Sequence, residues 1–204
     1  MKQFQIFILF FIFSAASYAA DKYYNASLYL NDGSIKSGLA TYVSTGNGEY
    51  ILFKSNEKSN VEKIESININ KLVYNSGEES YEYEYLKVYK GWKQVKIKGP
   101  IWLEVVDKGI ATLYLTITYV EGGVLPQDRT SVAFRDYYIM RKGESAAKLY
   151  ATISTANNNQ TFRAKAPLYF ADYPELAEKI KNKEYTWKDL EEVVKIYNNW
   201  AKEQ

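Results

Sequence analysis

The feature that most constrains the fold is an alternation of apolar and polar residues with a period of two, which runs from Tyr23 to about Thr161. Successive side chains of a β-strand point to opposite faces of a sheet, so this period indicates strands with one face against a core. The clearest case is the pair of segments 23–30 and 35–44, because Asp32-Gly33 between them is a strong signal for a type I′ turn. We therefore predict an antiparallel hairpin at this position.

Further strands are predicted at residues 50–54, 81–85, 113–119, 134–142 and 148–153, which are rich in Tyr, Thr, Ile and Val. The last two segments flank Gly143-Glu144 and form a second expected hairpin. In the segment 113–119 the face that begins with Leu113 is expected to point inward, opposite the face that carries Tyr114. Residues 61–74 have no clean period and are expected to be extended. Short strands at this spacing predict a sandwich, a barrel or stacked antiparallel sheets, and the sequence leaves these open.

The pattern changes to a helical one in the C-terminal part. Asp172 is placed to cap a short helix with Pro174 in its first turn. Thr186 opens a second helix, in which apolar residues from Trp187 to Trp200 recur at steps of three and four. The predicted fold is therefore mainly β, with antiparallel sheets in a sandwich-like or barrel-like arrangement and two C-terminal α-helices packed on the β body.

The N-terminus has the three parts of a secretory signal peptide. Lys2 precedes an apolar run at residues 4–13, and the small residues Ser17 and Ala19 come before an expected cleavage after Ala19. A transmembrane anchor needs roughly 20 apolar residues, about twice the length of this run. We predict a signal peptide at 1–19, an antiparallel β domain at 20–165 and a helical segment at 166–204 packed on the same domain. The product would be exported to the periplasm or the cell surface, or secreted, with no transmembrane span after signal cleavage.

The composition removes several kinds of chemistry. The chain has no Cys and no His, which excludes thiol nucleophiles, Ser-His-Asp triads and zinc sites built on thiolate or imidazole. No phosphate-binding glycine loop, calcium loop or nucleophile elbow occurs, so no cofactor and no metal are expected. The pairs Glu82 with Glu84 and Glu104 with Asp107 have no supporting motif, and no catalytic residue is assigned. The net charge of +2 gives no general attraction to nucleic acid.

Charge is strongly segregated in the middle of the chain. Four glutamates fall in residues 78–84, and lysines with interleaved aromatics follow them. Such a basic, aromatic stripe can contact phosphate, an anionic glycan or lipid headgroups. The alternative is that both segments are solvated strand edges that pair across strands. The candidate binding residues are Lys87, Tyr89, Lys90, Trp92, Lys93, Lys96, Lys98 and Trp102. Tyr81, Tyr83 and Tyr85 share one strand face and could extend this stripe into an aromatic platform.

The chain also resembles a known family in several phrases. The run 168–180, then Tyr185 and the run 190–198, is similar to the C-terminal signature of a family of uncharacterised exported proteins of Bacteroidota. The phrases 102–109 and 137–142 and the opening hairpin are similar to that family too. The resemblance implies an exported, β-rich protein with terminal helices and implies no chemistry. The chain departs from the family at Tyr173, where many members carry Cys.

Together these features predict an exported, non-catalytic protein of the cell envelope. Its expected partners are an envelope glycan, a lipid headgroup or another envelope protein. The alternative is a secreted hydrolase that depends on carboxylates such as Glu82, Glu84 or Glu104. A hydrolase of glycosides needs two such groups at a defined separation, which the sequence alone does not establish.

Overall fold

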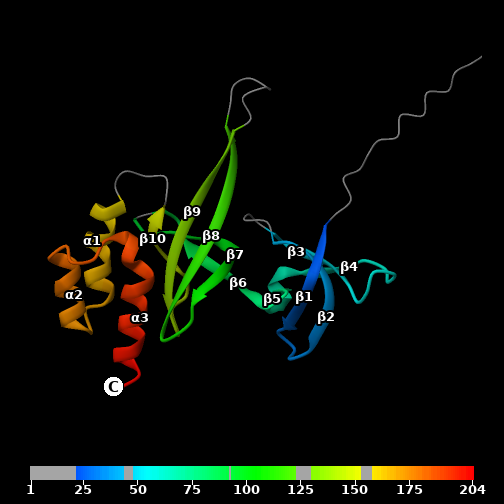
Figure 1. Ribbon diagram of the computed structural model, residues 1–204, viewed down its shortest axis with the longest axis horizontal. Coiled ribbons are helices and arrows are strands. Elements are labelled where there is room, and N and C mark those ends of the chain that lie inside the picture. Colours follow the sequence, from blue (N-terminus) through cyan, green and yellow to red (C-terminus); the bar gives the residue numbers. More distant parts are fainter. Residues whose placement is uncertain (1–21, 44–47, 92, 123–129, 153–157) are drawn as a thin grey trace, which may run out of the picture.

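A computed structural model describes residues 22–43, 48–91, 93–122, 130–152 and 158–204, without the side chains of 118–122, 130–133 and Asn158. The predicted signal peptide lies outside these residues. Within them, ten strands form one antiparallel sheet in the order β10-β9-β8-β7-β6-β5-β1-β2-β3-β4 (Figure 1). The strands are β1 (Tyr23–Leu30), β2 (Ile35–Thr41), β3 (Tyr50–Lys54), β4 (Glu62–Glu65), β5 (Ile69–Ser76), β6 (Glu79–Tyr89), β7 (Ile97–Asp107), β8 (Ala111–Gly122), β9 (Thr130–Arg141) and β10 (Lys148–Thr152).

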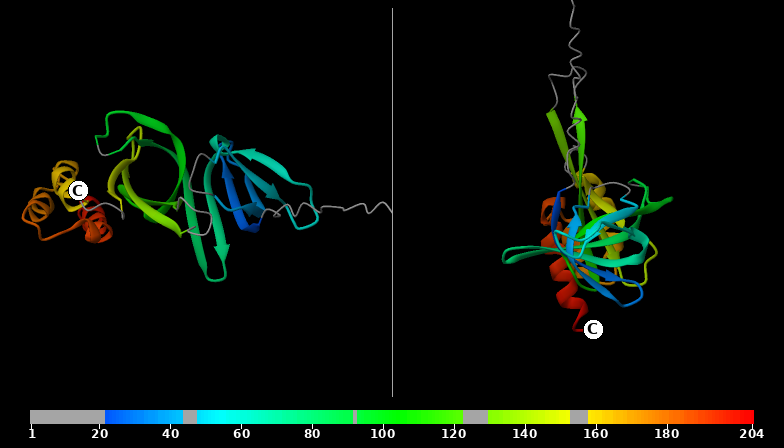
Figure 2. Two further views of the ribbon diagram at one scale, coloured as in Figure 1. Left: turned by 90° about the horizontal axis from the view of Figure 1, so that it is seen from above. Right: turned by 90° about the vertical axis from the view of Figure 1, so that its right-hand side faces the viewer.

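Strands β6 to β10 curl into a small barrel, visible as a ring in the left view of Figure 2. The ring closes where Val88 at the end of β6 forms a parallel bridge with Ala147, just before β10. Two backbone hydrogen bonds hold this closure, from Tyr89 N to Ala147 O and from Ala147 N to Lys87 O, each 2.9 Å. The barrel interior is filled by Val88, Ile101, Leu103, Tyr114, Tyr138, Ala147 and Leu149. The sheet is therefore of the barrel-like kind that the sequence left open.

Strands β1 to β5 enclose a second core on the other side of the shared strands β6 and β7. The predicted hairpin at its start is confirmed, because β1 pairs with β2. Its turn is not of type I′, since Gly33 has φ +86° but Asp32 does not have a positive φ. Leu28, Ile51, Phe53 and Leu72 are buried in this core, joined by Tyr83 from β6 and Trp102 from β7. The segment 61–74 divides into β4, a 3₁₀ turn (Ser66–Asn68) and most of β5, so it is extended only in part.

Three α-helices cover the outer face of the barrel: α1 (Asn158–Tyr169), α2 (Pro174–Lys181) and α3 (Leu190–Ala201). The third core lies between them and strands β8 to β10. Neighbouring residues of β8 are consequently buried on both faces, since Leu113 points to the helices and Tyr114 to the barrel interior. The expectation that β8 buries one face is wrong because this strand lies between two cores.

The helix α1 was not expected, and the expected boundary between residues 165 and 166 falls inside it. Its first turn is polar, and Pro167 lies within its last turn, so the sequence carries weak helical signals there. Tertiary packing stabilises it, because Phe162 and Ala166 are fully buried against the sheet. The other two helices begin close to where they were predicted.

Asp172 does not cap α2, contrary to the prediction from its position before Pro174. The N-cap is Tyr173 and has no side-chain capping bond. Asp172 instead forms two hydrogen bonds with the Arg141 guanidinium, of 3.1 and 2.9 Å, and accepts one from Tyr197 Oη at 2.7 Å. The guanidinium lies between two aromatic rings, 4.6 Å from the centroids of both Tyr169 and Tyr197. Arg141 ends β9, so this cluster fastens the helical layer to the barrel.

Thr186 opens the last helical segment as predicted, with a capping box in which Thr186 and Asp189 bond reciprocally. The apolar stripe of α3 is buried through Leu190, Val193 and Val194. No helix among the described residues is long and apolar enough to cross a bilayer.

Candidate functional site

The predicted lysines lie on the hairpin that joins β6 and β7. Lys87, Lys90, Lys93, Lys96 and Lys98 are all exposed, and Tyr89 is half-buried. Within the described part of the chain, none of these five ammonium groups lies within ion-pair distance of a carboxylate. Trp92 lies outside the described residues. The structure therefore brings the predicted lysines together on one hairpin.

Trp102 is not part of that surface, because it is only 2% exposed and belongs to the core of β1 to β5. Its indole Nε1 donates to Ser66 Oγ at 3.1 Å, and Ser66 in turn donates to the carbonyl of Gly48. Tyr85 packs on the indole with ring centroids 5.1 Å apart. This tryptophan has a structural role, so the expected platform of Trp102 with three tyrosines does not form.

The acidic segment on β6 is paired, though not with the lysine hairpin. Lys108 forms salt bridges with both Glu82 and Glu84, and Lys71 lies 3.7 Å from Glu82. Tyr114 Oη donates to Glu84 at 2.7 Å. These contacts link β5, β6 and the end of β7, which gives both glutamates structural partners.

A tyrosine-rich groove of about 620 Å³ lies elsewhere on the sheet, at the opposite half of β6. It is formed by β1, the end of β2, the β5–β6 hairpin and the middle of β7. We call it the tyrosine groove. Its lining residues are Tyr23, Tyr24, Asn25, Leu39, Tyr42, Glu57, Tyr74, Asn75, Ser76, Gly77, Tyr81, Tyr83 and Glu104.

Three of the groove tyrosines expose much of their surface: Tyr42 is 52% exposed, Tyr81 39% and Tyr24 36%. Tyr74 and Tyr83 beneath them are buried. The rings meet mostly edge to face, at centroid distances of 5.7 Å for Tyr24 with Tyr42 and 5.6 Å for Tyr74 with Tyr83. The two buried rings therefore support those of Tyr24 and Tyr42, which reduces the side-chain entropy that a ligand would have to remove.

The buried hydroxyl groups form a directed hydrogen-bond chain. Tyr83 Oη donates to Glu104 Oε2 at 3.1 Å, so the 2.6 Å contact between Tyr42 Oη and Tyr83 Oη is donated by Tyr42. Tyr74 Oη accepts from the amide of Val43 at 2.9 Å and donates to a backbone carbonyl. Burial raises the pKa of Tyr83 and of Tyr74 far above the ordinary value. These phenols therefore stay protonated and act as donors across the neutral range.

The charge of the groove comes from carboxylates. Glu104 and Glu57 line it, and no lysine or arginine does among the described residues. Tyr81 at its rim donates to Glu79, and this hydrogen bond raises the pKa of the Tyr81 phenol. Asn25 and Asn75 add amide donors and acceptors. The ammonium groups of Lys22 and Lys54 lie over two lining rings, 5.2 Å from the ring centroid of Tyr24 and 4.5 Å from that of Tyr23. The groove thus combines aromatic rings and hydrogen-bonding groups with carboxylates in its lining.

Only part of this groove is predictable from the sequence. The row of Tyr81 and Tyr83 was singled out, and Glu104 was considered as a carboxylate. Most of their neighbours come from residues 23–25, 39–42 and 74–77, which the strand order β6-β5-β1-β2 brings together, and Glu57 comes from the connection between β3 and β4. That order is a tertiary property, so the alternation of residues within each strand could not reveal the groove.

No family model, no curated protein and no solved structure matches the chain. The described residues contain no group of three or more Asp or Glu side chains placed to hold a metal ion.

Proposed function

We propose that this chain is an exported, non-catalytic protein of the cell envelope that binds a glycan in the tyrosine groove. Export rests on the signal-peptide pattern of residues 1–19. Binding rests on one observation: the exposed rings of Tyr24 and Tyr42 pack on two buried tyrosines, in a groove that carboxylates and amides also line. Aromatic rings stack on the apolar faces of sugars, while carboxylates and amides hydrogen-bond the sugar hydroxyls, so this combination suits a carbohydrate.

The charge of the groove narrows the class of glycan. Glu57 and Glu104 line the groove itself and would repel a uronic acid or a sulfated sugar, whereas the nearby Lys22 and Lys54 lie over rings of the groove and are not among its described lining residues. Hydroxyl groups of a neutral sugar can donate to Glu104, whose other contact is the Tyr83 phenol. The same carboxylates would attract the ammonium group of an amino sugar. The proposed ligand is therefore a polysaccharide of neutral or amino sugars.

The experiment is a binding assay of purified residues 20–204 with neutral, amino and acidic polysaccharides, followed by calorimetry on those that bind. Tyr42→Ala removes the most exposed groove ring and should weaken binding about tenfold or more. Tyr50→Ala is the matched control, since Tyr50 is 45% exposed on a neighbouring strand and does not line the groove. Equal affinity of wild type and Tyr42→Ala, or preference for acidic glycans, would reject the groove as the site.

A hydrolase is the second candidate, because two carboxylates, Glu57 and Glu104, line one groove. Glycoside hydrolysis requires such a pair. Release of reducing ends by the wild-type protein, abolished by Glu104→Gln in a folded variant, would establish turnover. If the protein only binds the glycan, neither the wild type nor Glu104→Gln releases reducing ends, and the substitution changes the affinity for the glycan alone.

A further inference from the structure

The lysine hairpin carries a second surface feature that the tyrosine groove does not use. Between its lysines, Val95 is 77% exposed and Ile97 is 47% exposed. Single exposed apolar side chains are common on proteins, but here two of them stand among five exposed ammonium groups that have no carboxylate within ion-pair distance in the part of the chain that the structure describes. This pairing of apolar and basic groups is typical of protein surfaces that enter the interface of an anionic bilayer.

The hairpin is held in place by the barrel. Lys90 N donates to Lys96 O at 2.7 Å across the hairpin, and Gln94 Nε2 donates to the carbonyl of Leu149 on β10 at 2.9 Å. Gly91 with φ +60° and Gln94 with φ +51° shape the turn. The backbone closure of β6 on Ala147 lies at the base of the hairpin. These hydrogen bonds tie the described residues of the hairpin to each other and to β10.

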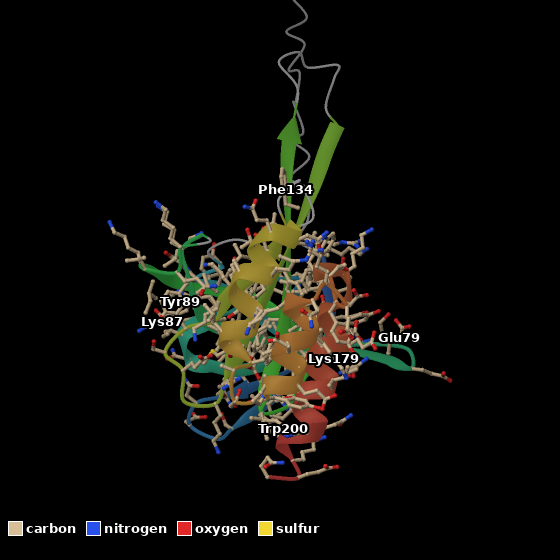
Figure 3. The ribbon with its side chains drawn as sticks, turned by 90° about the vertical axis from the view of Figure 1, so that its left-hand side faces the viewer. Glu79, Lys87, Tyr89, Phe134, Lys179 and Trp200 are labelled. Carbon is tan, nitrogen blue, oxygen red and sulfur yellow. The ribbon has the colours of Figure 1, made fainter. Side chains whose placement is uncertain are left out.

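The charge of β6 is arranged along its length. Its first end carries exposed acids, among them Glu79, while its last end carries Lys87 and Tyr89. Figure 3 shows Glu79 on one side of the molecule and Lys87 with Tyr89 on the other. The carboxylates nearest to the lysines in sequence, Glu84 and Glu104, are occupied by Lys108 and by Tyr83. A negatively charged plane would therefore attract the lysine end and repel the acidic end.

We infer that the β6–β7 hairpin docks the protein on an anionic lipid bilayer, with Val95 and Ile97 entering the headgroup region and the lysines binding lipid phosphates. This site is independent of the tyrosine groove, and neither needs the other. A soluble anionic protein or polyanion would leave the two exposed apolar side chains without an apolar environment. A bilayer offers an apolar phase directly beneath a layer of negative charge.

The test is co-sedimentation of residues 20–204 with vesicles of phosphatidylcholine containing about 30% phosphatidylglycerol, against vesicles of pure phosphatidylcholine. The variant Lys90→Gln, Lys93→Gln, Lys96→Gln should bind the anionic vesicles at least about tenfold more weakly than wild type. The matched control replaces Lys183, Lys188 and Lys202 by Gln, which removes the same charge from exposed positions on the helical side. It should retain most of the binding.

The apolar contribution is tested separately. Val95→Ser keeps the charge and should lower the affinity for anionic vesicles several-fold. Most of the binding that remains is electrostatic, so it should be lost when the salt concentration rises from about 0.1 to about 0.5 M. The inference is overturned if wild type binds no vesicles, if it binds both compositions equally, or if the control triple variant loses as much as the hairpin variant. Binding of heparin, but of no vesicle, would overturn it in favour of a soluble polyanion. Tyr42→Ala should bind vesicles as wild type does, so failure of the groove and failure of the hairpin are distinguishable.

Discussion

The side-chain amide of Asn198 on α3 bonds to both backbone groups of Ala111 on β8. Oδ1 accepts from Ala111 N and Nδ2 donates to Ala111 O, each at 2.9 Å. The amide thus takes the place of a neighbouring strand at the first residue of β8. Gly109 lies directly beneath it, since a Cβ at this position would come within 2.3 Å of Nδ2.

Asn198→Ala should lower the free energy of unfolding by about 2–4 kcal/mol, because two buried backbone groups lose their partners. The adjacent Asn199→Ala is the control, because Asn199 is exposed; it should change stability by less than about 0.5 kcal/mol. Urea denaturation followed by tryptophan fluorescence measures both. Similar losses for the two variants would show that the Ala111 contact contributes nothing.

Arg141→Lys should destabilise the protein by about 1–3 kcal/mol despite the unchanged charge. A lysine cannot form the two bonds to Asp172 and stack between Tyr169 and Tyr197 at the same time. Arg135→Lys on the same strand is the matched control, since Arg135 is exposed. Thermal denaturation of both variants checks this, and an Arg141→Lys midpoint equal to that of wild type would contradict it.

Acid should weaken the attachment of the helical layer. Burial alone would raise the pKa of Asp172, but the Tyr197 hydroxyl and the Arg141 guanidinium together hold this pKa below its ordinary value. Burial would likewise raise the pKa of Glu144. Hydrogen bonds from Lys148, the Arg141 backbone amide and the Tyr169 hydroxyl outweigh burial, so this pKa also lies below its ordinary value. Both groups thus stabilise the fold above the pKa values of the unfolded chain, and this contribution is lost as pH falls through the folded values.

The measurement is the free energy of unfolding at neutral pH and at about pH 3. The wild type should lose stability in acid. The double variant Asp172→Asn, Glu144→Gln should be less stable at neutral pH and should lose less on acidification. An acid dependence identical to that of wild type would mean that other carboxylates carry the effect.

Tyr74→Phe should cost about 1–3 kcal/mol, because the buried Val43 amide loses its acceptor and the Thr41 carbonyl its donor. Tyr24→Phe, at an exposed ring of the same cluster, is the control and should be close to neutral. Chemical denaturation of the pair tests this. If Tyr24→Phe proves the more costly of the two, the hydroxyl of Tyr74 does not stabilise the groove.

The parts of the fold that were predictable are those encoded over a few residues. Asp32-Gly33 determines a turn locally, and Thr186 with Asp189 determines a helix start, so both were found from sequence. The two buried faces of β8 were not, because Tyr114 and Leu113 are buried by different layers. The helix α1 was missed for the same reason, since burial of Phe162 stabilises it rather than its own sequence pattern.

The two candidate sites also differ in how far the sequence predicts them. That the lysines share one surface segment was predictable because they are close in sequence, whereas Trp102, which was predicted to join them, is a core residue. The tyrosine groove was found only through Tyr81 and Tyr83, because its other walls come from strands that are neighbours in space and distant in sequence. Asn198 gave no signal at all: a polar residue next to an apolar stripe is usually solvated.

The strand β6 contributes to two cores and to both proposed sites, with Tyr81 in the groove and Lys87 at the hairpin. Lys87 follows Tyr81 by six positions of extended chain, a span of about 20 Å. Since one continuous strand joins them, the fold sets the distance between the groove and the lysines. When the protein is bound to a bilayer through the lysines, this distance would limit how far from the bilayer a sugar chain can be bound in the groove.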